Sequence, residues 1–137
     1  MEQVIIKEYS CYNEQEILAL YKSVGWSGCY SHSQVLRLAF ENSLCVLGAY
    51  VNGALAGLIR AVGDGQTVVL IQDVLVQPMY RRQGIGRALV AKLLARYRHV
   101  RQLHLLTDDL PHTVGFYRAV GFTAAEDVHC RAFTRIR

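Results

Sequence analysis

Three arginines and two glycines lie together in the segment Arg81–Arg87, directly before an amphipathic stretch. Pro78 ends the apolar run that precedes them, and apolar residues at fourfold spacing predict a helix after Gly86. The first turn of a helix carries backbone N–H groups without internal partners, and its dipole is positive at that end. Glycine lets an anion approach the backbone closely, and arginine adds charge-assisted hydrogen bonds. The segment therefore predicts a phosphate-binding site at a helix N-terminus.

Two common kinds of phosphate loop do not fit this segment. A P-loop ends in Gly-Lys-Ser/Thr, whereas the chain has Gly86-Arg87-Ala88. A dinucleotide-binding fingerprint needs a third glycine where Leu89 stands, and the first half of the chain lacks repeated βαβ units. Both kinds of site are excluded.

The elements that must position the segment follow from periodicity and turn residues. Asn13, with Glu16 three residues later, predicts a capped helix that Gly25 ends, and Asn52-Gly53 predicts a hairpin turn. The expected strands are Val4–Ile6 with Tyr9, Leu44–Tyr50, Ala54–Val62, Thr67–Val76, Leu103–Leu106 and a last strand or hairpin from Phe122. The expected helices begin at Asn13, at Ser31 or Ser33, after Gly86, and at Pro111. No repeat or linker divides this order, so we expect one α+β domain over residues 1–137.

The composition is that of a globular protein, with 52% hydrophobic and 19% charged residues. The longest apolar run, Leu44–Val51, is too short to span a bilayer, and the N-terminus resembles no signal peptide, so we expect a cytoplasmic protein that does not bind membranes. Cysteines and histidines show no metal-ligand spacing, so no metal is expected. The net charge of +4 is compatible with an anionic ligand but does not identify one.

The segment Arg81–Gly86 resembles the Q/R-x-x-G-x-G/A motif of the GCN5-related N-acetyltransferases (GNAT). Ile71–Pro78 looks like the fourth strand of that family, and Gly115–Phe122 is similar to its second signature, FYxxxGF. The two signatures occur in the family's order, and the resemblance covers the chain from about Leu44 to Phe122. It implies the GNAT fold, an α+β (α/β) arrangement with a mixed, mostly antiparallel central sheet of six to seven strands flanked by about four helices.

The resemblance also implies acetyl-coenzyme A as co-substrate. Backbone amides from Arg82 to Arg87 would bind its pyrophosphate, and the fourth strand, which parts from the fifth in this family, would pair with its pantetheine arm. A backbone N–H near Val74 or Leu75 would polarise the thioester carbonyl. The residues implied in cofactor binding are Val74, Leu75, Val76, Arg81, Arg82, Gln83, Gly84, Ile85, Gly86 and Arg87.

Two side chains match catalytic positions of the family. Tyr117 stands where the family usually has a general acid, which would protonate the departing thiolate; its alternative role is a packed helix aromatic. Asp73 lies on the strand where some members carry a general base; its alternative role is a paired structural carboxylate. An aromatic stretch containing Trp26, Tyr30 and His32 would either shape the acceptor site or cover the core.

The resemblance thus implies an N-acetyltransferase acting on a primary amine of a small molecule or peptide, in a family where homodimers are common. A non-catalytic acyl-coenzyme A sensor is the main alternative, because it would keep the phosphate loop and lose the chemistry. A nucleic-acid-binding module would use the arginine cluster, but the chain lacks interleaved aromatic and basic residues, and no nucleic-acid partner is expected.

Overall fold

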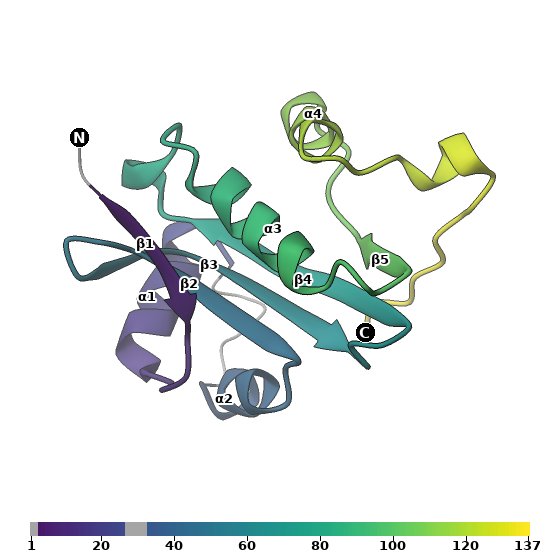
Figure 1. The fold of residues 1–137 in the computed structure, drawn as a ribbon. Coiled ribbons are helices and arrows are strands. Elements are labelled where there is room, and N and C mark those ends of the chain that lie inside the picture. Colours follow the sequence, from purple (N-terminus) through teal and green to yellow (C-terminus); the bar gives the residue numbers. More distant parts are fainter. Residues whose placement is uncertain (1–2, 27–32) are drawn as a thin grey trace. The chain divides into compact units, whose positions relative to one another are not determined.

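The computed structural model describes residues 3–26 and 33–137 (Figure 1). The strands are β1 (Val4–Glu8), β2 (Cys45–Val51), β3 (Ala54–Gly63), β4 (Val68–Val76) and β5 (Gln102–Leu105), and the α-helices are α1 (Glu14–Ser23), α2 (Ser33–Glu41), α3 (Ile85–Arg96) and α4 (Pro111–Ala119). Short 3-10 turns cover Pro78–Tyr80 and Ala125–Val128. The chain forms two compact units, one ending at Leu106 and one beginning at Thr107, and each is described by itself. The expectation of one domain over residues 1–137 stays a prediction.

The first unit contains a five-stranded sheet in the order β1-β2-β3-β4-β5. Neighbouring strands run antiparallel except β4 and β5, which run parallel. Asn52 and Gly53 join β2 to β3 with φ of 52° and 81°, as a two-residue hairpin turn requires. A mixed, mostly antiparallel sheet with four α-helices confirms the predicted fold class, and the sheet has fewer strands in the described residues than the expected six to seven.

Helix α1 begins as the sequence predicts, with a difference in detail. The Asn13 side chain accepts a hydrogen bond from the backbone N–H of Glu16 at 3.1 Å. In a full capping box the Glu16 carboxylate would accept from the Asn13 N–H. Here the Tyr9 hydroxyl comes between them, because it accepts from the Asn13 N–H at 3.1 Å and donates to Glu16 at 2.8 Å. The cap thereby ties the start of α1 to the end of β1.

Helices cover both faces of the sheet (Figure 1). On one face α1 and α2 pack over the strands, and the buried cluster there consists of Ile17, Leu20, Tyr21, Leu36, Phe40, Val46, Leu55, Leu58 and Leu75. On the other face α3 buries Ile85, Leu89, Val90 and Leu93. Gly57 faces α3, because a Cβ at that position would lie 3.2 Å from the Ile85 side chain. Buried apolar layers therefore pack against both faces of β3 and β4.

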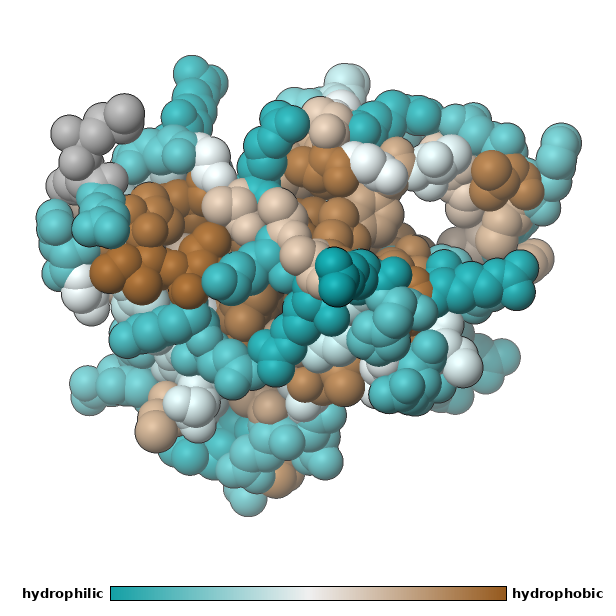
Figure 2. Space-filling model, viewed as in Figure 1, coloured by the Kyte–Doolittle hydropathy of each residue, from teal (hydrophilic) through white to brown (hydrophobic). Residues whose placement is uncertain are grey.

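Strand β1 forms one edge of the sheet, and apolar side chains are visible over it in Figure 2. Ile5 on this strand is 52% exposed.

No helix in the described part of the chain is long and apolar enough to cross a membrane.

The expected last strand from Phe122 is wrong. The described chain there forms the Ala125–Val128 turn, and no strand follows it up to residue 137. The segment turns back toward α4, and the Asp127 carboxylate lies 3.1 Å from the Arg118 guanidinium. Alternating apolar residues favour a strand only where a partner strand completes its backbone hydrogen bonds.

Candidate active site

Strand β4 contains a β-bulge at the position of the two polar residues that interrupt its apolar pattern. Arg60 of β3 lies opposite Asp73, and the next residue, Ala61, lies opposite Ile71. Gln72 therefore has no partner on β3. A bulge of this kind changes which backbone groups face each neighbouring strand.

Strand β4 loses its second neighbour at the same place. Its parallel pairing with β5 ends at Ile71 and Leu105. Beyond Ile71, no other strand of the first unit's described residues pairs with that side of β4 up to Val76. Strand β4 therefore continues beyond the end of β5, and the splayed strands that the family resemblance implies stay a prediction.

Alternation along β4 identifies the backbone groups at this open edge. The Gln77 N–H donates to the Ala56 carbonyl at 2.8 Å, so these two residues form a hydrogen-bonded pair. Hydrogen-bonded pairs alternate along an antiparallel ladder, which turns the N–H and C=O of Asp73 and Leu75 toward β3. Those of Val74 and Val76 point the other way, toward the open edge. Of the three predicted pantetheine-binding residues, the structure brings Val74 and Val76 to the edge, whereas the backbone of Leu75 faces β3.

The segment Arg81–Gly84 forms an exposed loop before α3. Arg82 and Gly84 adopt left-handed backbone conformations with φ of 64° and 78°. Gly84 is the N-cap of α3, and its carbonyl accepts the bond from the Ala88 N–H at 3.0 Å. The three amides between them have no acceptor inside the helix. Left-handed residues before a helix start curve successive N–H groups around a concavity that suits an anion.

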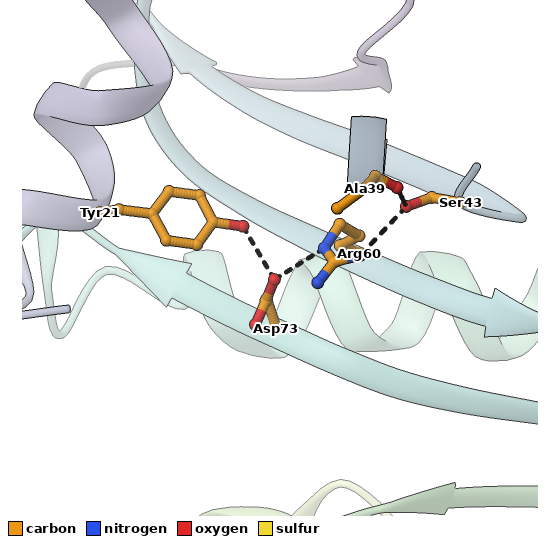
Figure 3. A network of polar contacts seen from close by, with 5 residues as sticks. All are labelled: Tyr21, Ala39, Ser43, Arg60 and Asp73. Atoms are coloured by element: carbon orange, nitrogen blue, oxygen red, sulfur yellow. Dashed lines mark hydrogen bonds and ion pairs between the residues drawn. The ribbon is translucent and has the colours of Figure 1, made fainter. Parts of the chain in front are cut away.

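Asp73 lies in a buried polar network on the α1 side of the sheet (Figure 3). Its Oδ2 accepts hydrogen bonds from the Arg60 Nε at 2.7 Å and from the Tyr21 hydroxyl at 2.8 Å. Arg60 Nη1 donates to the Ser43 hydroxyl at 3.3 Å, and that hydroxyl donates to the Ala39 carbonyl at 2.7 Å. Among the described residues, Arg60 and Asp73 are the two buried charged side chains, with exposures of 6% and 2%.

Sequence reasoning missed Arg60 and Tyr21. A usable signal was present for Arg60, because it is the single charged residue in the apolar run Ala54–Val62, as Asp73 is in the next run. Two opposite charges on strands joined by a short turn predict a cross-strand pair. Tyr21 carried no such signal, because an aromatic residue on the apolar face of a helix is ordinary core.

Tyr117 lies on α4 in the second unit and is half-buried. Its ring packs edge-on against Phe116 and Phe122, with centroids 5.0 and 6.0 Å away. Burial, and to a lesser degree the negative charge of Asp108, raises the pKa of the Tyr117 hydroxyl above its usual value. The phenol is therefore protonated at neutral pH.

The predicted aromatic stretch is described in part. Trp26 follows α1, is 37% exposed, and packs edge-on against Tyr21 with centroids 6.2 Å apart. Tyr30 and His32 lie outside the described residues. In residues 3–26 and 33–137, no three histidine, cysteine or acidic side chains are grouped to hold a metal.

The family model described as "Acetyltransferase (GNAT) family" matches residues 11–122. A GNAT-family acetyltransferase of Streptococcus pneumoniae is similar in structure, with a TM-score of 0.88, 35% identity, and 98% of each chain covered. Serotonin N-acetyltransferase 2 of rice is 35% identical over 107 residues, covering 74% of this chain and 54% of that protein. Histone acetyltransferase TAP1 of Glycine max is 31% identical over 137 aligned residues, covering 90% of this chain and 58% of that protein. The chain thus spans little more than half the length of these two curated relatives.

Proposed function

Because the chain belongs to the acetyltransferase (GNAT) family, we propose that it transfers the acetyl group of acetyl-coenzyme A to a primary amine of a small molecule or peptide. The observation that carries the proposal is the open edge of β4, directly beyond its bulge and followed in the chain by a helix start whose free amides suit an anion. An extended amide-containing arm with a pyrophosphate at its end matches both features. Acetyl-coenzyme A has that shape and that charge.

In this proposal the donor binds mostly to backbone groups. The amides of Ile85, Gly86 and Arg87 meet the pyrophosphate, helped by the α3 dipole and the exposed guanidinium groups of Arg81 and Arg82. The pantetheine arm adds itself to β4 as a strand, through the N–H and C=O of Val74 and Val76. Gln83 and Gly84 shape the loop before α3. The buried side chain of Leu75 belongs to the cluster under α1 and α2, and this packing holds β4 in place.

The proposed reaction is direct acyl transfer. The free amine attacks the thioester carbonyl carbon, and a C–N bond forms as the carbonyl π electrons move to oxygen. The backbone N–H of Val74 would stabilise that oxyanion. The C–S bond then breaks, the amine nitrogen loses a proton, and the coenzyme leaves as a thiolate that gains one.

Tyr117 is the proposed donor of the proton that the thiolate gains. Its raised pKa supports this role, because the phenol reaches the end of the reaction protonated. The role of Asp73 as the base that accepts the amine proton stays a prediction. Its carboxylate already accepts two hydrogen bonds at Oδ2, which favours the alternative that water carries this proton away.

Isothermal titration calorimetry with acetyl-coenzyme A, followed by a thiol-release assay on a panel of amines, tests the proposal. The panel should include arylalkylamines and lysine peptides, since one relative is named for serotonin and another for histones. We expect binding, and thiol release that depends on the amine. Binding without release on any amine would favour the acyl-coenzyme A sensor, and absence of binding would refute both functions.

A further inference from the structure

The buried pair Arg60–Asp73 is a costly way to hold two strands together. Taking two charges out of water offsets most of their mutual attraction, and apolar pairs of similar size stabilise a core as well or better. The pair nevertheless lies in the part of the sheet that helices cover on both faces. The Tyr21 hydroxyl donates to Asp73 Oδ2, the oxygen that also accepts from Arg60. We therefore look for the role of the Arg60–Asp73 pair in the backbone groups that it positions.

The network lies directly at the bulge. Arg60 and Asp73 are cross-strand partners, and the register shift occurs immediately beside them. Directly before β4, the Thr67 carbonyl accepts a hydrogen bond from the Gln102 N–H at 3.3 Å. Alternation along the strand therefore turns the backbone groups of the odd-numbered β4 residues before the bulge toward β5. After the bulge, the even-numbered Val74 and Val76 face that side. Without the bulge, Asp73 and Leu75 would face it instead.

We propose that Arg60 and Tyr21 are positioning residues, which hold Asp73 at the bulge so that the Val74 N–H faces the acyl thioester. The inference rests on the proposed function and deepens it. Arg60 fixes Asp73 to β3, and Tyr21 fixes the same oxygen to α1. Ser43 and Ala39 extend the tie to the end of α2. In this inference Asp73 acts through these contacts instead of serving as the base.

The mildest test is Tyr21→Phe, which removes one donor to Asp73 and keeps the ring among its aromatic neighbours Trp26 and Phe40. Tyr12→Phe is the matched control, because the Tyr12 ring also packs against Phe40 and its buried hydroxyl has no hydrogen-bond partner in the described structure. We expect kcat/KM for acetyl-coenzyme A to fall about tenfold in Tyr21→Phe at every pH, since small displacements of a reacting group have effects of this size. Tyr12→Phe should stay within about twofold of the wild type, because it removes a hydroxyl that makes no hydrogen bond in the described structure and none to Asp73.

A double variant separates positioning from stability. Arg60→Met with Asp73→Leu replaces the ion pair by apolar side chains, so we expect it to remain folded while kcat/KM falls about a hundredfold. Interstrand nuclear Overhauser contacts then report the register of β3 and β4 without any need for activity. The wild type should show contacts between Leu58 and Leu75, and the double variant should show a shifted or mixed register.

Two results would overturn the inference. One is a folded double variant that keeps the wild-type register and wild-type kinetics. The other is Asp73→Asn activity that recovers as the pH rises, because a missing base is replaced by hydroxide or by deprotonated amine. If the wild-type protein neither binds acetyl-coenzyme A nor releases thiol, the proposed function fails. The register measurement then still decides whether the network holds the bulge.

Discussion

Replacing Gly84 by alanine tests the phosphate loop, because this residue combines a left-handed backbone with open surroundings. Its φ is 78°, and a Cβ there would find nothing within 4 Å. The substitution therefore causes no clash and changes only the cost of the backbone conformation. For a residue with a Cβ, the left-handed conformation costs about 1–2 kcal/mol.

This conformational cost can reduce either the folding free energy or the binding free energy, depending on how firmly the surrounding structure holds the residue. Gly84 lies in an exposed loop that no paired strand holds, so we expect alanine to relax in the free protein and to be forced back when the pyrophosphate binds. A cost of about 1–2 kcal/mol on binding raises the Kd for acetyl-coenzyme A roughly 5- to 30-fold. The melting temperature of the free protein should change little.

Gly53 provides the matched control. It has a φ of 81°, and a Cβ there would also find nothing within 4 Å, but the paired strands β2 and β3 hold it in the hairpin. In Gly53→Ala the cost should therefore appear on folding. An unfolding entropy of about 2.1 cal/mol/K per residue gives roughly 0.3 kcal/mol/K for 137 residues, so about 1.5 kcal/mol lowers Tm by about 5 °C.

Calorimetric titration and thermal unfolding of both variants measure the two quantities. The expected pattern is a weaker Kd with an unchanged Tm in Gly84→Ala, and the reverse in Gly53→Ala. A Gly84→Ala protein that binds within twofold of the wild type would refute the reasoning, because the loop amides would then not depend on the left-handed residue.

Three further predictions concern single residues. Tyr117→Phe should lower kcat about a hundredfold with an unchanged Kd for acetyl-coenzyme A. Because burial raises the pKa of the Tyr117 hydroxyl, the loss of wild-type rate from phenol ionisation should begin at a higher pH than it would for an ordinary tyrosine. Asp64 accepts hydrogen bonds from three backbone amides and the Thr67 hydroxyl, which hold its pKa well below the usual range. Its stabilising effect should thus be present above about pH 4 and be lost at lower pH, so melting curves of Asp64→Ala and the wild type should converge in acid. Gly57→Ala places a Cβ 2.8 Å from the Leu75 carbonyl oxygen, so β3 must shift; denaturant unfolding should show a loss of about 1–3 kcal/mol, and an unchanged midpoint would contradict the packing described.

Local signals predicted most of the elements. The helix cap at Asn13, the Asn52-Gly53 turn and the helix expected after Gly86 each follow from residues adjacent in sequence. The structure has all three, with that helix beginning at Ile85, one residue before Gly86. The last strand could not be predicted reliably, because a strand depends on a partner that lies elsewhere in the chain. The same limit applies to the site. The helix start was readable from its glycines and arginines, whereas the bulge at Gln72 depends on pairing between two strands.

The Arg60–Asp73–Tyr21 network illustrates what sequence reasoning left open for Asp73. One carboxylate on a strand is compatible with a base or with a structural role. The choice depends on whether donors surround it. Arg60 lies 13 residues away on the neighbouring strand, whereas Tyr21 lies 52 residues away on a helix. A charged residue within an apolar run therefore indicates a buried polar contact, but its role depends on partners that the structure identifies.

The open edge of β4 also affects how this protein behaves when its ligand is scarce. In the described part of the first unit, no strand pairs with the N–H and C=O groups on this side of β4 beyond Ile71, and such groups are a template on which a strand of another molecule can add. An occupant that pairs with Val74 and Val76 would cover that template. If acetyl-coenzyme A binds there as proposed, its supply affects the solubility of the chain, and preparations without the coenzyme should self-associate sooner than saturated ones. The short length of the exposed stretch, which ends where Pro78 begins a turn, limits this liability.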